Sequence, residues 1–313
     1  MSINLCTRAV KRIIREIGEL NASKDNLIEN GIYFHCNDDD ITTIYAMIIG
    51  TSDTPYEDGY YFFTIHFKGD YPLEPPKVFY HTQGSNIRFN PNLYVANNES
   101  GGKVCLSMIN TWSGPGWVPT LTITNVLMAI QALVLVDEPL KNEPGYSESN
   151  NVATINHYTN IIRYCNIQTA ILGMIKSIPT GFEPFQEIIE DYFLKKYENI
   201  GDKIMHSVKD AKYDLGKVFA PCYNFVCIID YQKLFKEFLE LLYSVRHKKG
   251  ITDNSDIKYI LSCNKIIDEK LTDKKGDLSD KKGDLTDKKG DLTDKKGDLT
   301  NKKAKLTDKK ETI

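Results

Sequence analysis

The chain has 313 residues, a net charge of −3 at pH 7 and 41% hydrophobic residues. That length suffices for one or two domains with a sizeable core. No block rich in lysine and arginine stands apart from acidic residues, which argues against nucleic acid as the main partner. A membrane partner is not expected either, because no apolar run reaches the length of about 18 residues that a membrane-spanning helix needs.

The seven cysteines have irregular spacing and include no CxxC pair, which argues against a disulfide framework and against a zinc site. We therefore expect free thiols, no bound metal and an intracellular location, with cytosol and nucleus both open. Residues 1–20 are amphipathic and charged, and they contain no apolar core of a signal peptide.

Residues 3–20 come first in chain order and place apolar side chains at helical spacing, which predicts an amphipathic helix. Strand character then appears in four segments rich in β-branched and aromatic residues, at residues 31–36, 41–50, 60–67 and 77–81. Clusters of Asp, Asn, Pro and Gly separate these segments. Consecutive strands joined by short turns favour an antiparallel meander.

The pattern changes after the strands. Residues 82–120 are rich in Gly, Asn, Pro and Ser and show little periodicity, and so long an irregular stretch is often functional. Helical periodicity returns at residues 121–136, 148–176 and 183–198.

Two further regions complete the chain, after a first domain that we place at residues 1–200. Residues 201–270 are predicted to form a helical extension, to which the sequence assigns no role. Residues 271–313 repeat a seven-residue unit that contains one leucine and usually a glycine. One leucine per unit buries too little apolar surface to offset the chain entropy, which predicts a disordered low-complexity tail.

The irregular stretch contains a candidate nucleophile, Cys105. Gly101 and Gly102 precede it, which favours an accessible thiol, and a thiolate is a strong nucleophile near neutral pH. Taken alone, a single cysteine is more often a small buried hydrophobic residue. No histidine lies within 20 residues of Cys105, so a Cys–His protease pair has no local support.

Four motifs lie in and around this stretch. They are Tyr71–Val78 (YPLEPPKV), Phe89–Tyr94 (FNPNLY), Gly102–Leu106 (GKVCL) and Trp117–Ile123 (WVPTLTI). Taken alone, Asn92 is either a turn residue or an amide that stabilises an oxyanion. In this order, after the helix and the strands, the motifs resemble the ubiquitin-conjugating enzyme family over residues 5–200.

The resemblance implies an α+β fold with an N-terminal helix, a four-stranded antiparallel meander, an active-site loop and C-terminal helices. Residues 1–200 would then be the catalytic domain. The pattern is most similar to the large, inhibitor-of-apoptosis-type conjugating enzymes, through Arg88–Asn92 (RFNPN) and Asn142–Tyr146 (NEPGY). Two departures stand out: Asn90 replaces the usual histidine, and residues 95–100 look like an insertion.

The resemblance also implies roles for individual residues. Cys105 matches the cysteine that carries ubiquitin as a thioester, and Asn92 matches the asparagine that stabilises the oxyanion or holds the nearby loop. Glu143 falls where many members carry an aspartate that orients or deprotonates the incoming lysine. The remaining matches are partner-binding positions, namely Lys11 and Arg12 for the activating enzyme and Leu73, Val118 and Pro119 for a ligase.

These inferences together predict a transferase. A ubiquitin-conjugating enzyme would receive ubiquitin from the activating enzyme on Cys105 and pass it to a lysine amine of a protein substrate, with a ligase. No bound cofactor is expected, because the activating enzyme consumes the ATP upstream. Three alternatives stay open: a conjugating enzyme for a ubiquitin-like modifier, a catalytically inactive variant that binds ubiquitin, and a scaffold in which residues 201–270 and the tail carry the function.

Overall fold

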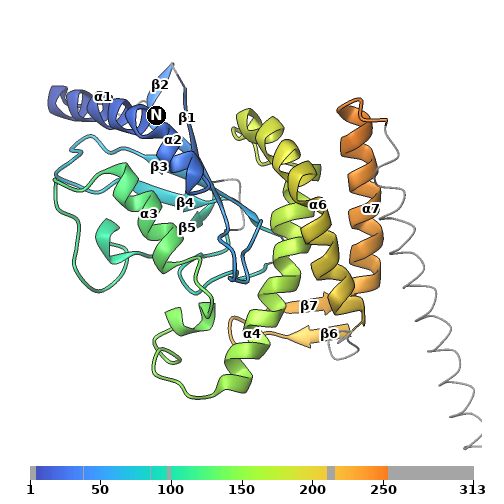
Figure 1. Cartoon of the computed structure of the whole chain (residues 1–313). Coiled ribbons are helices and arrows are strands. Elements are labelled where there is room, and N and C mark those ends of the chain that lie inside the picture. Colours follow the sequence, from blue (N-terminus) through green and yellow to red (C-terminus); the bar gives the residue numbers. More distant parts are fainter. Residues whose placement is uncertain (1–4, 38, 85, 97–99, 210–215, 253–313) are drawn as a thin grey trace, which may run out of the picture. The chain divides into compact units, whose positions relative to one another are not determined.

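The structure is a computed structural model, and Figure 1 shows its course from the N-terminus onward. It describes residues 5–37, 39–84, 86–96, 100–209 and 216–252. The predicted repeat tail at residues 271–313 and the end of the predicted extension, residues 253–270, lie outside the described residues.

The first helix, α1 (Thr7–Ala22), confirms the predicted amphipathic helix. Ala9, Ile13 and Leu20 are fully buried, because their spacing places them on one helical face. This face packs against the sheet and against a later helix, α3. Glu16 lies on the same face and is also buried, which makes it an exception among the apolar side chains.

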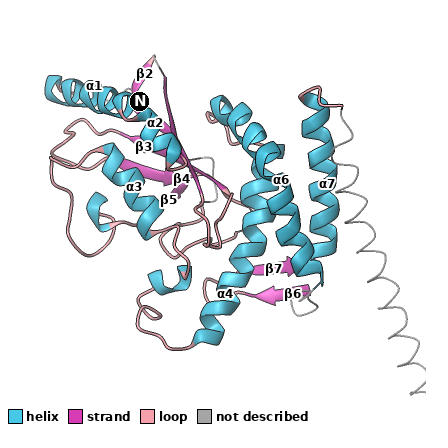
Figure 2. Cartoon of the chain, viewed as in Figure 1, coloured by secondary structure: helices cyan, strands magenta, loops and turns pink. Residues whose placement is uncertain are grey.

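The sheet is antiparallel, and its strands follow the chain in the order β1-β2-β3-β4-β5 (Figure 2). A short helix, α2, lies between α1 and β1. The bounds are α2 Lys24–Glu29, β1 Ile32–Asn37, β2 Asp40–Ile49, β3 Tyr60–His66, β4 Lys77–Tyr80 and β5 Gly102–Lys103. The predicted four-stranded meander is confirmed, and the two residues of β5 extend it from within the irregular stretch.

Both faces of β3 are buried by aromatic side chains. Phe62 contacts Phe182 at a ring distance of 4.9 Å. The neighbouring Tyr61 points to the opposite face, where it contacts Tyr56 at 5.5 Å and Phe89 at 5.8 Å. Phe89 directly precedes Asn90, so this aromatic cluster gives the candidate active-site segment a rigid base.

The helices that follow the irregular stretch begin with α3 (Ile123–Leu133), where the Thr122 and Asn125 side chains form a capping box. The predicted helix at 148–176 is present with a change of winding in its second half. Residues 166–173 are π-helical, and Asn166 accepts a hydrogen bond from the Tyr61 hydroxyl at 2.6 Å. The parts are α4 Val152–Cys165, η3 Asn166–Gly173 and α5 Met174–Lys176; the shorter 3-10 turns are η1 Ser107–Ile109, η2 Pro139–Asn142 and η4 Glu183–Phe185.

The predicted extension is helical only in part. Helix α6 (Gln186–Lys209) runs across the predicted boundary at residue 200, and a hairpin of β6 (Gly216–Phe219) and β7 (Val226–Ile229) follows. Strands of four residues are too short to show an alternating pattern, which is why the sequence did not predict them. Helix α7 (Tyr231–Lys248) packs along α6, with Phe238 at 5.8 Å from the ring of Phe193.

None of the helices in the described residues combines the length and the apolar character that a bilayer crossing requires.

Stability is expected to fall at acidic pH because of His81, which follows β4. Burial and the nearby His66 lower the pKa of His81 from 6.5 to about 4. Its Nε2 lies 2.9 Å from the Thr64 hydroxyl. Between pH 6.5 and 4 the unfolded chain binds a proton that the folded chain does not. The contribution of His81 to stability is therefore fully present above pH 6.5. The free energy of unfolding decreases as the pH falls from 6.5 to about 4.

Urea unfolding across this pH window measures the loss. We expect His81→Gln to flatten the slope of stability against pH, because the buried imidazole is gone. The exposed His206 is a matched control, and His206→Gln is expected to keep the wild-type slope. A wild-type slope in His81→Gln would contradict the prediction.

Candidate active site

The structure places Cys105 directly beside Asn92. The Cys105 backbone N–H donates to the Asn92 carbonyl oxygen at 2.8 Å. One step further along, the Tyr94 N–H donates to the Lys103 carbonyl oxygen at 3.0 Å. The two segments therefore run side by side as an extended pair, and the candidate nucleophile is held against the asparagine that the sequence assigned to the same site.

Cys105 is buried, with 1% of its surface exposed. The accessible thiol that the preceding glycines favoured is thus not what the structure shows. Gly102 pairs with Tyr80 of β4, and a Cβ added to it would lie 1.6 Å from the Tyr94 carbonyl oxygen. That glycine permits close packing of the backbone, not access to the sulfur.

Asn90, which replaces the expected histidine, is a fully buried centre of hydrogen bonds. Its Nδ2 donates to the Val134 carbonyl oxygen at 2.7 Å and to the Tyr56 hydroxyl at 3.1 Å. Its Oδ1 accepts from the Asn92 backbone N–H at 2.8 Å and from Asn142 Nδ2 at 3.2 Å. Asn90 thereby ties the segment before Asn92 to the end of α3 and to the loop that carries Asn142.

The side chain of Asn92 contrasts with its fixed backbone. Its Oδ1 is buried, and no described residue donates a hydrogen bond to it. A buried amide oxygen without a partner is unfavourable in a purely structural position. The arrangement suits a side-chain amide that turns toward a transient oxyanion instead of serving the resting fold.

Glu143 follows Asn142 and is held by a residue of the β6–β7 hairpin. The Tyr223 hydroxyl donates to Glu143 Oε2. Burial, together with this bond to Glu143, raises the pKa of Tyr223, so the phenol keeps its proton. The structure thus brings Glu143 to the Asn90–Asn92 segment through Asn142, and it adds a tyrosine donor that the sequence did not suggest.

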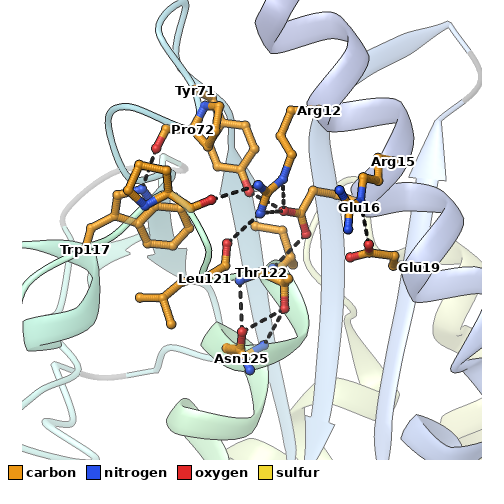
Figure 3. Close-up of polar contacts among 12 residues, drawn as sticks. Arg12, Arg15, Glu16, Glu19, Tyr71, Pro72, Trp117, Leu121, Thr122 and Asn125 are labelled. Carbon is orange, nitrogen blue, oxygen red and sulfur yellow. Dashed lines mark hydrogen bonds and ion pairs between the residues drawn. The ribbon is translucent and has the colours of Figure 1, made fainter.

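A second polar cluster surrounds Glu16 on α1, as Figure 3 shows. Glu16 is 1% exposed. Its Oε1 accepts from Arg12 Nε at 2.7 Å and from the Tyr71 hydroxyl at 2.7 Å, and its Oε2 accepts from the Ile123 N–H at 3.0 Å. Burial and the bond to Glu16 raise the pKa of Tyr71, which keeps its hydroxyl a donor. The buried carboxylate is therefore compensated by one cation and two other donors.

The Arg12 guanidinium also holds the segment that leads into α3. It donates to the carbonyl oxygen of Leu121 at 2.7 Å (Figure 3). It also donates to the carbonyl oxygen of Pro119 at 2.7 Å. Its side chain is 18% exposed. The structure therefore places Arg12 largely within the chain, whereas Lys11, the other residue assigned to the activating enzyme, is exposed.

The three residues assigned to ligase binding lie on two connected loops. Leu73 is 60% exposed and Val118 is 49% exposed, and Pro119 is exposed as well. Between the loops, the Trp117 indole N–H donates to the Pro72 carbonyl oxygen at 2.7 Å (Figure 3). The structure thus presents these three residues as exposed apolar side chains on two loops that a hydrogen bond joins.

Two residues of these clusters were missed by sequence reasoning. Glu16 carried a signal, because it occupies the helical face of Ile13 and Leu20, where an apolar residue is expected. Tyr223 carried none, since it lies 118 positions after Cys105 in a hairpin that was not predicted.

No group of three or more metal-binding side chains is present among the described residues.

The sequence was compared with those of known protein families and with known relatives. The sequence model described as "Ubiquitin-conjugating enzyme" matches residues 12–165. Ubiquitin-conjugating enzyme E2 Z of Homo sapiens is 39% identical over 160 residues, which are 51% of this chain and 44% of that protein. The dual E2 ubiquitin-conjugating enzyme/E3 ubiquitin-protein ligase BIRC6 of Homo sapiens is 36% identical over 205 residues, which are 62% of this chain and 4% of that protein.

A solved structure, human ubiquitin-conjugating enzyme E2 G1, is 30% identical with a TM-score of 0.34, over 42% of this chain and 97% of that chain. The chain spans less than half the length of the curated relatives named above. The matched segment contains both Asn92 and Cys105. Through residues 12–165, the chain belongs to the ubiquitin-conjugating enzyme family.

Proposed function

We propose that the chain accepts ubiquitin from the activating enzyme as a thioester on Cys105 and transfers it to a lysine amine of a protein substrate, with a ligase. The observation that carries this proposal is the 2.8 Å hydrogen bond from the Cys105 N–H to the Asn92 carbonyl oxygen. It sets the candidate nucleophile beside a side-chain amide whose buried oxygen has no partner among the described residues.

The proposed reaction has two steps. In the first, the Cys105 thiolate attacks the thioester carbonyl at the ubiquitin C-terminus, and the activating enzyme's thiolate leaves. In the second, a neutral lysine amine attacks the new thioester, the C–S bond breaks, and the Cys105 thiolate departs as the amine loses a proton. The Asn92 amide donates to the oxyanion that forms as the amine attacks. No bound cofactor is needed, because the thioester already carries the energy for amide formation.

Glu143 would take part in the second step. A carboxylate there attracts and orients the incoming ammonium group, and it accepts the proton as the amine attacks. The Tyr223 phenol engages Glu143 Oε2, which fixes the direction of the carboxylate. This arrangement supports orientation of the lysine as the larger part of its role.

The partner surfaces of the proposal follow from exposure. Leu73, Val118 and Pro119 offer an apolar patch for a ligase, and Lys11 offers an exposed cation for the activating enzyme. Arg12 would act on the ligase side from within, because it holds the Pro119 carbonyl oxygen. Similarity to both E2 Z and BIRC6 supports the further proposal of kinship with the large, inhibitor-of-apoptosis-type conjugating enzymes.

The test is charging on a non-reducing gel. With ubiquitin, activating enzyme and ATP, we expect a band shifted by one ubiquitin that a thiol reductant removes. Cys105→Ala is expected to abolish the shift, and Cys105→Ser to give an oxyester band that resists the reductant. Cys6→Ala is the matched control, because Cys6 is an exposed thiol outside the site.

Other outcomes would point to the alternatives. Charging by a ubiquitin-like modifier and its own activating enzyme, but not by ubiquitin, would assign the chain to that modifier. Absence of a shift with every modifier, together with measurable ubiquitin binding, would contradict catalysis and favour an inactive ubiquitin-binding variant.

A further inference from the structure

The β6–β7 hairpin reaches the candidate active site through its tip. Tyr223 and Asn224 at the tip have left-handed backbone conformations, with φ of 67° and 50°. The Ala220 N–H donates to the Phe225 carbonyl oxygen at 3.0 Å and closes the turn. The tight turn leaves the Tyr223 side chain half-buried beyond the two strands, where it meets Glu143.

The hairpin is anchored to α4 without the help of Tyr223. His157 Nε2 lies 3.0 Å from the Phe219 carbonyl oxygen. Tyr158 contacts Phe225 at a ring distance of 6.3 Å, and the sulfur atoms of Cys165 and Cys227 are 3.6 Å apart. Phe225 and Cys227 are buried, and so are Val218 and Ile229 of the same hairpin. Tyr223 is therefore not needed to hold the hairpin in place.

Tyr223 instead contacts two groups that control the active-site loops. Its hydroxyl donates to Glu143, and its ring lies 4.7 Å from the guanidinium carbon of Arg88. Arg88 donates to the carbonyl oxygens of Asn90 at 3.2 Å and Pro91 at 2.7 Å, and so fixes the backbone that leads into Asn92. The tyrosine thus touches both the loop before Asn92 and the loop after Asn142.

These contacts form a closed circuit. Glu143 contacts Tyr223, Tyr223 contacts Arg88, and Arg88 contacts Asn90. Asn90 in turn accepts from Asn142, the residue before Glu143. Arg88 is also stacked on Tyr94 at 3.5 Å, which stabilises the guanidinium from within the catalytic segment. A closed set of contacts restricts the motion of each member more than separate pairs do.

We propose that Tyr223 is a positioning residue for lysine transfer, which holds the Glu143 carboxylate and, through Arg88, the backbone before Asn92 in the geometry that aminolysis needs. This inference rests on the proposed function. It gives the hairpin of residues 216–229 a role in the chemistry. The transfer step is the one that loss of Tyr223 should slow, because a lysine amine must be aligned and deprotonated in it. Thioester exchange onto Cys105 needs neither Glu143 nor the other members of this circuit of contacts.

The experiment separates charging from discharge. The full chain is charged with ubiquitin, the activating enzyme is stopped, and single-turnover discharge is followed over a range of free lysine concentrations. For Tyr223→Ala we expect charging within twofold of wild type and a maximal discharge rate lowered about tenfold, because misplacement of a reacting group by a fraction of an ångström has effects of this order. Tyr223→Phe keeps the aromatic ring on Arg88 and loses the hydroxyl donor. Its maximal discharge rate should therefore lie between those of wild type and Tyr223→Ala.

A coupling measurement distinguishes positioning from a general structural effect. In a Glu143→Ala background, Tyr223→Phe is expected to cause no further slowing, since the hydroxyl acts through Glu143. The exposed Tyr243 on α7 supplies the matched control, and Tyr243→Phe should discharge like wild type. Thermal unfolding of Tyr223→Phe is expected to coincide with wild type.

Two results would overturn the inference. One is wild-type discharge by both normally charged Tyr223 variants. The other is equal slowing by Tyr223→Phe with and without Glu143. If the wild-type protein itself failed to charge, the proposed function would fall and this inference with it, so the two failures are distinguishable.

Discussion

Replacement of Arg12 by methionine is expected to lower the free energy of unfolding by about 3 kcal/mol, because Glu16 would remain buried without its cation. Methionine preserves much of the apolar stem of the side chain, so the loss reports the charge and its hydrogen bonds. The Pro119 and Leu121 carbonyl oxygens would also lose their donor. Urea unfolding of the two proteins at neutral pH measures the difference.

The same helix offers a matched control. Arg15 forms an exposed ion pair with Glu19, with side-chain exposures of 73% and 41%. Arg15→Met is expected to change stability far less than Arg12→Met, as for most exposed pairs. Adding Glu16→Gln to Arg12→Met should recover part of the stability, since the amide removes the uncompensated charge and still accepts from Tyr71. Similar losses at Arg12 and Arg15 would show that the buried pair has no special importance.

Replacement of Asn92 by alanine is expected to leave charging of Cys105 intact and to slow discharge to lysine by about a hundredfold, the usual loss when an oxyanion donor is removed. The fold should tolerate the change, because the backbone of Asn92 makes the bonds to Asn90 and Cys105, and alanine keeps that backbone. Single-turnover discharge of the charged protein is the measurement.

Asn150→Ala serves as the control, since Asn150 is exposed in the loop before α4. It should discharge at the wild-type rate. Two results would speak against an oxyanion role: wild-type discharge by Asn92→Ala, or a loss of charging as large as the loss of discharge. The second result would indicate instead that Asn92 mainly shapes the segment around Cys105.

The local elements could be predicted from the sequence because each has a strong pattern of its own. Tyr60–His66 is a run of aromatic and β-branched residues, and it forms β3. Residues 3–20 repeat apolar side chains at helical spacing, and they give α1. In both cases the relevant signal lies within a few residues. Cys105 and Asn92 were assigned to one site only through the resemblance of their motifs to the family, and their backbone pairing was not predicted.

The remaining features depend on contacts between distant parts of the chain. The burial of Cys105 arises from pairing with residues 92–94 and could not be read from the glycines beside it. Arg12 was assigned to the activating enzyme through the resemblance of its helix to the family's first helix. The helix gave no sign that carbonyl groups more than 100 positions away also accept from its guanidinium. Tyr223 belongs to a hairpin whose position is fixed by α4, and no local pattern contains that information.

The contact between Tyr223 and Glu143 also has a consequence for protein synthesis. The two residues are 80 positions apart, and the hairpin leaves the ribosome after all of residues 12–165. Domains fold as units, and the described residues up to 252 form one compact unit, in which Phe62 of β3 packs on Phe182. We therefore expect Glu143 and Arg88 to gain their contacts with Tyr223 only after translation has moved beyond the hairpin.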